Sequence, residues 1–219
     1  MNKALIVLFC ISFIACGKQK SNSVYHVGSL KATKKLGELY GKIALDSLDK
    51  SNLYGLGPLE GLKGEITIID GVSYVSFLNS LGQLKVIENY NVKAPFFVYG
   101  KVDEWKPTTM PSHVTDLGSL ELYLTSIIST ESPFFFRMVG TVAYAKVHIQ
   151  NQQGERNNKV DFELTDEEVT IIGVYSQSHQ RVFTHHDSFI HTHLISKSKK
   201  MMGHLDELKI EKVELFLSQ

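Results

Sequence analysis

The stretch Phe189–His204, FIHTHLISKSKKMMGH, constrains the fold most, because it contains three of the chain's nine histidines. Two lie within one apolar run and the third directly follows a second run. If Lys197–Lys200 forms a four-residue loop, the flanks pair as a β-hairpin in which His193 lies directly opposite His204. Alternate residues of a strand share a face, so His191 joins these two. Opposite Cβ atoms lie about 4.5–5.5 Å apart, which suits imidazole nitrogens that each approach a zinc ion to about 2.0–2.1 Å. The hairpin therefore predicts a metal site.

A second interpretation of these histidines stays open. They alternate with Ile190, Thr192 and Leu194, and histidines in this pattern can line the solvent-facing side of an edge strand. The opposition of His193 and His204 also depends on the assumed loop length. The third histidine, at a spacing that a hairpin allows, favours the metal site.

The rest of the chain predicts many strands and two helices. Apolar residues recur at a helical period over residues 33–48, with Thr33 as N-cap, and a second helical pattern covers residues 119–130. A hairpin beginning at Glu65 is expected around an Asp70-Gly71 turn. Further strands are predicted over residues 94–102, 134–149 and 168–176, and a proline-bounded loop over residues 105–111. This pattern indicates an α+β fold, predominantly β, with curved mixed or antiparallel sheets.

The first sixteen residues, MNKALIVLFCISFIAC, combine one basic residue with an apolar run that is too short to span a bilayer. Their ending resembles a bacterial lipobox, in which cleavage leaves Cys16 as a lipidated N-terminus. An ordinary signal peptide cut nearby is the alternative. Residues 17–28 are expected to form a polar tether. The sequence thus predicts an exported lipoprotein, anchored in a membrane of the cell envelope.

The remaining domain, residues 29–219, contains no cysteine, because Cys10 and Cys16 both belong to the leader. This excludes disulfide scaffolds, thiol nucleophiles and cysteine-based zinc sites. The domain is long enough for an ordinary hydrophobic core, which two intimate β-rich halves, about 29–130 and 131–219, could share. Lys and Arg balance Asp and Glu at 23 each, so nucleic acid is not expected as a partner.

Four segments, in this order, resemble the alpha-acetolactate decarboxylase family: GLKGEITIIDGVSY, FFFRMVGTV, HTHLIS and GHLDEL. They span roughly residues 30–210, and the H-x-H-x10-H pattern is the most specific of them. The resemblance implies that His191, His193 and His204 bind Zn²⁺. It also implies that Glu65 and Arg137, at the matching motif positions, reach into the same site. Members of this family are carboxy-lyases that split 2-acetolactate into acetoin and carbon dioxide.

This chemistry suits the residue types. Acetolactate is a 2-hydroxy-3-oxo acid, and a zinc ion with three neutral histidines keeps positions open for its two oxygens and stabilises the enediolate as a Lewis acid. Arg137 can hold the carboxylate through paired hydrogen bonds, and Glu65 can relay the proton. On the residues alone, Glu65 could instead be an exposed rim residue and Arg137 part of a buried ion pair.

Members of this family usually continue beyond the segment that GHLDEL resembles, and a C-terminal glutamate approaches their metal. This chain ends at Gln219, so a shortened C-terminal region is expected, with Glu207, Glu211 and Glu214 as candidate substitutes. A non-catalytic metal- or ligand-binding lipoprotein on the same fold is the alternative function. A cupin-like iron oxygenase is disfavoured, because no glutamate follows at cupin spacing. A homodimer is an assembly that the sequence leaves open.

Overall fold

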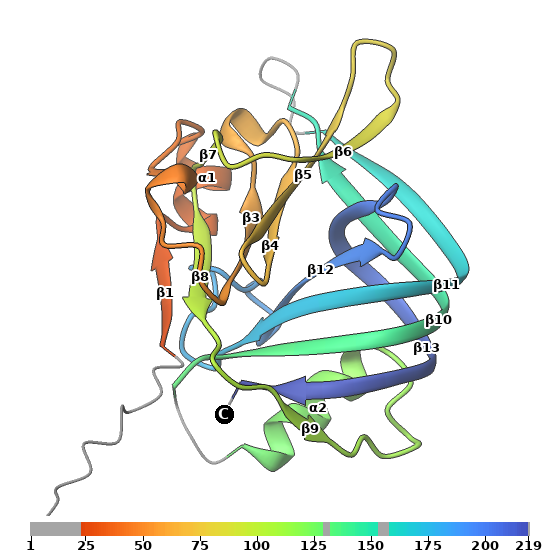
Figure 1. The fold of residues 1–219 in the computed structure, drawn as a ribbon. Coiled ribbons are helices and arrows are strands. Elements are labelled where there is room, and N and C mark those ends of the chain that lie inside the picture. Colours follow the sequence, from red (N-terminus) through yellow and green to blue (C-terminus); the bar gives the residue numbers. More distant parts are fainter. Residues whose placement is uncertain (1–22, 129–131, 153–157, 219) are drawn as a thin grey trace, which may run out of the picture.

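The computed structural model describes residues 23–128, 132–152 and 158–218, which form two large antiparallel β-sheets packed against each other, a small two-stranded sheet and two α-helices (Figure 1). The predicted fold class, α+β and predominantly β, is confirmed. Cys16 and the rest of the predicted lipobox lie outside the described residues. In the described part of the chain, no helix has both the length and the apolar character needed to cross a membrane.

The first sheet has six strands in the order β1-β8-β3-β4-β5-β6. The hairpin predicted at Glu65 is confirmed, with Asp70 and Gly71 both at positive φ in the turn between its strands, as a tight two-residue turn requires. The strand bounds are β1 Val24–Val27, β3 Leu53–Pro58, β4 Glu65–Ile69, β5 Val72–Leu78, β6 Leu84–Glu88 and β8 Phe97–Lys101.

The second sheet has the order β10-β11-β12-β13-β9, and an additional pairing of β10 with β13 closes four of its strands into a ring. Figure 1 shows β10, β11 and β13 as long, curved strands. The strand bounds are β9 Lys106–Thr108, β10 Phe134–Gln150, β11 Lys159–Tyr175, β12 Ile190–Ser196 and β13 Met202–Leu217. The stretch predicted as a loop over residues 105–111 therefore contains the short strand β9.

The first predicted helix is wrong in its extent. Helix α1 covers only Leu30–Leu36, and its N-cap is Ser29 rather than Thr33. Gly37 ends the helix in the left-handed conformation (φ 70°), which glycine adopts without steric cost. The residues that continue the helical pattern form β2 (Ile43–Ala44), which pairs with β7 (Lys93–Ala94), and a 3₁₀ turn at Leu45–Ser47. A second 3₁₀ turn covers Glu60–Leu62.

Helix α2, Leu117–Ile127, agrees with the second predicted helix apart from its ends. A reciprocal capping box between Asp116 and Ser119 starts it. Its buried residues Leu120 and Leu124 pack in a large hydrophobic cluster against one side of the ring formed by β10, β11, β12 and β13.

The opposite side of the ring faces the first sheet. Tyr54 and Leu56 of β3 share a buried cluster with Phe135 of β10 and with Ile172 and Val174 of β11. Side chains that β12 and β13 direct to this side are therefore enclosed between the two sheets.

Candidate metal centre

The histidine hairpin forms in the predicted register. His193 of β12 lies directly opposite His204 of β13, and the Ser196 amide donates to the Met201 carbonyl at 2.9 Å, which closes the predicted four-residue loop. Gly203 lets β13 approach β10 closely, since a Cβ there would lie 2.6 Å from the His148 carbonyl oxygen.

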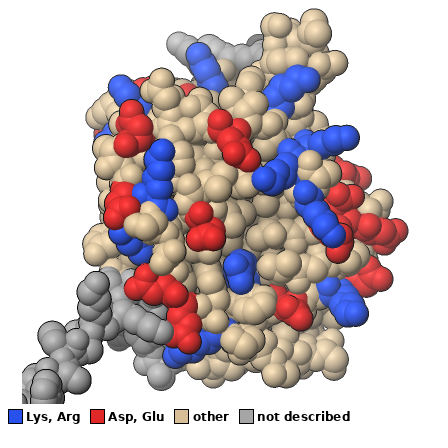
Figure 2. Space-filling model, in the orientation of Figure 1, with Lys and Arg blue, Asp and Glu red and all other residues tan. Residues whose placement is uncertain are grey.

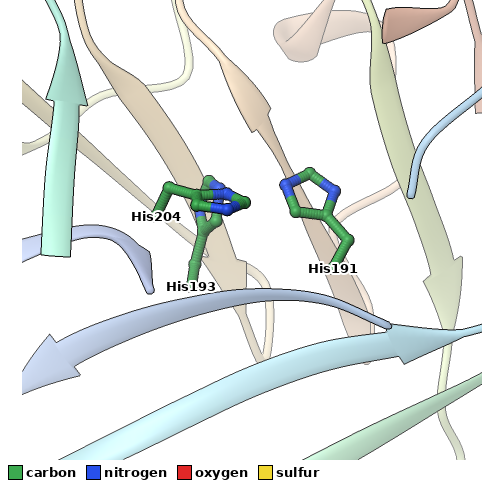
Figure 3. A group of neighbouring side chains, drawn as sticks. All are labelled: His191, His193 and His204. Carbon is green, nitrogen blue, oxygen red and sulfur yellow. The ribbon is translucent and has the colours of Figure 1, made fainter. Parts of the chain in front are cut away.

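The three predicted ligands gather between the sheets (Figure 3). Their ring centroids lie 5.0–5.6 Å apart, and one nitrogen from each ring lies within 4.8 Å of the others. The side chains are 4% exposed at His191, 0% at His193 and 13% at His204. Nδ1 of His191 and Nε2 of His193 are buried without a hydrogen-bond partner among the described residues. These unsatisfied nitrogens fit a bound metal ion.

Burial also keeps the imidazoles neutral. It lowers the pKa of His193 to about 3 and holds the pKa values of His191 and His204 well below the ordinary value. His193 is oriented by Thr67, whose Oγ1 lies 2.9 Å from its Nδ1. This contact leaves Nε2 of His193 for a metal, in the manner of partners that orient metal-binding histidines.

Glu65 faces the histidines from the first sheet. It is 3% exposed, so the interpretation as an exposed rim residue is wrong. Its Oε2 lies 3.7 Å from Nε2 of His193, and its Oε1 accepts a hydrogen bond from the backbone amide of Gln150 at 3.2 Å. Burial raises the pKa of Glu65 to about 8, so the carboxyl group holds a proton at neutral pH.

A second polar group adjoins the first. The pairing of β10 with β13 places His148 opposite His204, and the two rings lie 4.7 Å apart. Nδ1 of His148 lies 2.7 Å from Oδ2 of Asp206, and its Nε2 lies 3.0 Å from the side-chain nitrogen Nε2 of Gln150. Since the NH₂ group of Gln150 donates a hydrogen bond to Nε2 of His148, the ring carries its proton on Nδ1. This N–H donates a hydrogen bond to Asp206.

Asp206 is charged in this arrangement. Burial raises its pKa, but the hydrogen bond from His148 and the charge of Lys159 outweigh burial, so the pKa lies below the ordinary value. His148, His204 and Asp206 also have ligand atoms within 4.8 Å of one another. Because Nδ1 of His148 and Oδ2 of Asp206 are already hydrogen-bonded to each other, these two atoms do not require a metal as partner.

A cleft opens beside these residues. His185, which precedes the second sheet's strand β12, forms part of its wall, with its ring 5.6 Å from that of His204. The lining residues are Leu30, Lys34, Pro58, Leu62, Glu65, Phe96, His148, Gln150, Phe183, His185, His191 and His204.

Arg137 does not line this cleft. It lies on the same side of the second sheet as His193, but Ile172 of β11 separates them, so the backbones of the two residues are about 9–10 Å apart, which is two strand spacings. Its guanidinium carbon lies 4.9 Å from the ring centroid of Trp105 and 4.8 Å from that of Phe216. The structure thus brings Glu65 and the three histidines together and leaves Arg137 outside the group.

The three C-terminal glutamates are also outside it, since Glu207, Glu211 and Glu214 are all exposed. The carboxylate beside His204 belongs to Asp206. Sequence reasoning missed Asp206, although its separation of two residues from His204 predicts a shared face. It also missed Lys34, His148 and His185, whose positions depend on contacts between distant segments.

Comparison with known proteins agrees with this architecture. A protein of unknown function from Staphylococcus aureus, similar to alpha-acetolactate decarboxylase, aligns with TM-score 0.72 and 18% identity over 90% of this chain and 85% of that one. Acetolactate decarboxylases from Bacillus subtilis subspecies spizizenii and from B. subtilis strain 168 align with TM-score 0.71 and 18% identity, over 90% of this chain and 86% and 85% of theirs. The search of curated proteins gives no match.

At this identity the solved structures establish the fold. The family model described as alpha-acetolactate decarboxylase matches residues 24–219, which include both sheets and every residue of the candidate site. The chain therefore belongs to the alpha-acetolactate decarboxylase family.

Proposed function

We propose that this protein decarboxylates 2-acetolactate (2-hydroxy-2-methyl-3-oxobutanoate) to acetoin and carbon dioxide, with Zn²⁺ held by His191, His193 and His204. The observation that carries the proposal is the convergence of three buried, neutral imidazoles next to a buried carboxyl group in a chain of this family. When bound, zinc supplies a Lewis acid that draws electron density toward the ketone oxygen.

The donor set supports zinc as the metal. Three imidazoles without a thiolate suit zinc, and neutral rings bind a cation without first losing a proton. The hydrogen bond between Thr67 and Nδ1 of His193 fixes which nitrogen of that ring remains available.

Glu65 is suited to supply the proton that completes the reaction. Loss of carbon dioxide breaks the bond between the carboxylate and C2 and leaves an electron pair that requires one proton at C2. The raised pKa of Glu65 keeps a proton on its carboxyl group at neutral pH, and Oε2 points toward His193. Delivery from this fixed group would protonate one face of the intermediate, which favours a single enantiomer of acetoin.

The test is acetoin release from racemic acetolactate by purified, zinc-loaded protein. We expect release well above the rate in buffer alone and none above it for His193→Ala. Release by the wild-type protein that does not exceed the buffer rate would refute the proposed activity.

The position of Arg137 favours a second candidate, a metal- or ligand-binding protein without turnover. The guanidinium that the family resemblance assigns to the substrate carboxylate lies outside the cleft, and the exposed C-terminal glutamates do not reach it. Stoichiometric zinc together with no acetoin release would support this candidate.

We also propose that the protein is exported and anchored by lipid at Cys16. The support is the leader sequence, with its apolar run and its lipobox-like ending Phe13-Ile14-Ala15-Cys16. The wild-type protein should fractionate with membranes, and Cys16→Ser should move it to the soluble fraction. Equal membrane association of both forms would refute lipid anchoring.

A further inference from the structure

The cleft contains a cation that sequence reasoning did not identify. Lys34 of α1 lines it together with Glu65, His191 and His204, and among the described lining residues it is the single Lys or Arg. No carboxylate of the described residues lies within ion-pair distance of its ammonium group. The substrate of the proposed reaction is an anion, so its carboxylate needs a positive partner in this cleft.

The position of Lys34 is fixed by its helix. The amides of Leu30 and Lys31, in the first turn of α1, donate to the carbonyls of Val182 and Arg181 at 2.7 and 3.0 Å. These two residues belong to the same segment as His185. The helix that carries Lys34 is therefore held against the segment that forms the cleft wall.

The surroundings of Lys34 are basic on its outer side. A second cavity shares Leu30, Lys34 and His185 with the cleft and is otherwise lined by Lys31, Lys35, Arg181 and His186. No Asp or Glu lines this second cavity within the described chain. On the face of the molecule shown in Figure 2, by contrast, acidic and basic side chains are interspersed. The positive lining creates a field that draws anions toward the cleft.

Burial at the cleft also changes the pKa of Lys34. Lys34 is exposed along much of its side chain, yet partial loss of water around its ammonium group lowers its pKa below the ordinary value. A bound carboxylate would restore a favourable partner to this cation.

We propose that Lys34 binds the carboxylate of the substrate, at the point where the cleft meets the basic cavity lined by Lys31, Lys35 and Arg181. This inference deepens the proposed function, because it names the substrate-binding cation of the same site. In this chain, the amine of Lys34 on α1 thus has the role of binding the carboxylate that the family resemblance assigned to Arg137.

The experiment measures binding without turnover. The probe is 2,3-dihydroxy-2-methylbutanoate, in which the ketone of acetolactate is reduced so that carbon dioxide cannot leave, and its uncharged amide is the matched ligand. Affinities are measured by calorimetry with zinc-loaded wild-type protein, Lys34→Met, Lys34→Arg and Lys35→Met. Lys35 is the matched control, because it lines the outer cavity but not the cleft.

We expect Lys34→Met to weaken binding of the acid about 10- to 100-fold, as loss of a charge-assisted hydrogen bond predicts, and to leave binding of the amide unchanged. Lys34→Arg should keep most of the affinity, and Lys35→Met should change it less than about threefold, with an effect that added salt removes. Zinc content should be equal in all four proteins.

Unchanged affinity of Lys34→Met for the acid, an equal loss for acid and amide, or no binding of the acid to the wild-type protein would each overturn the inference. These outcomes are separate from failure of the proposed function. A protein that binds the acid through Lys34 and releases no acetoin retains the anion site without the activity. A protein that releases acetoin with no dependence on Lys34 retains the activity without this site.

Discussion

The histidine cleft and the surroundings of Arg137 are two polar regions on the same side of one sheet, and they satisfy their polar atoms in opposite ways. In the cleft, Nδ1 of His191 and Nε2 of His193 are buried and have no hydrogen-bond partner in the described part of the protein. At Arg137, the guanidinium lies over the rings of Trp105 and Phe216, although its Nε makes no hydrogen bond to any residue that the structure describes. The protein itself surrounds the cation at Arg137, whereas the cleft needs a ligand to complete it.

The electrostatics follow the same division. Burial keeps the histidines and Glu65 uncharged in the cleft, so a divalent cation and an anionic substrate would bring the charge with them. Arg137 keeps its own charge and places it over aromatic faces, where the ring quadrupole stabilises it. From this contrast we expect the first region to bind ligands and the second to stabilise the fold.

The largest expected effect comes from removing a metal ligand. His191→Ala and His193→Ala should each lower zinc from about one ion per chain to nearly none and abolish acetoin release. Elemental analysis of the purified proteins checks this, with the exposed His113→Ala as the control. Full zinc content in both cleft variants would show that the histidines are not ligands.

The same variants should also reveal how the metal stabilises the fold. The ligands come from two strands, so binding free energy contributes to folding free energy. At a free zinc concentration 1,000 times Kd this amounts to about 4 kcal/mol, or a shift in Tm of roughly 10 °C for a domain of this size. A chelator should lower the Tm of the wild-type protein and of His113→Ala, and leave that of His193→Ala unchanged.

The next effect separates metal binding from proton transfer within the cleft. Glu65→Gln should keep its zinc but lower turnover about 10²- to 10⁴-fold, the usual contribution of a general acid or base. The residual acetoin should be less enantiomerically pure, because its proton would come from water. Chiral chromatography of the product measures both quantities. Wild-type rate and chirality in this variant would exclude Glu65 from the reaction.

The contrast between the two regions also explains what the sequence predicts and what it does not. The hairpin follows from local pattern, since strand alternation and a four-residue loop suffice to place His193 opposite His204. The short helix α1 was overestimated because a continuing apolar period concealed the effect of Gly37. Such errors arise where a glycine competes with periodicity.

Contacts between distant segments were harder to predict. The opposition of His148 and His204 requires the closure of β13 on β10, and the position of Lys34 requires α1 to dock on residues 181–182. Neither has a spacing signal in the sequence. Arg137 illustrates the converse, because a charge in an apolar run predicts a partner but does not say whether that partner is a ligand or an aromatic ring.

The smallest effect tests the second region directly. Arg137→Lys keeps the positive charge but loses the planar group that covers two rings, and Arg and Lys are not equivalent at such a site. If the role of Arg137 is to stabilise the fold, the free energy of unfolding in urea should fall by about 1–2 kcal/mol, while zinc content and kcat/KM stay within about threefold of wild type. Trp105 is the chain's one tryptophan, so its fluorescence should change in the folded variant and report on this contact alone. If instead kcat/KM fell more than about 100-fold with stability unchanged, Arg137 would act on the substrate as the family resemblance implies, and the division of roles between the two regions would be wrong.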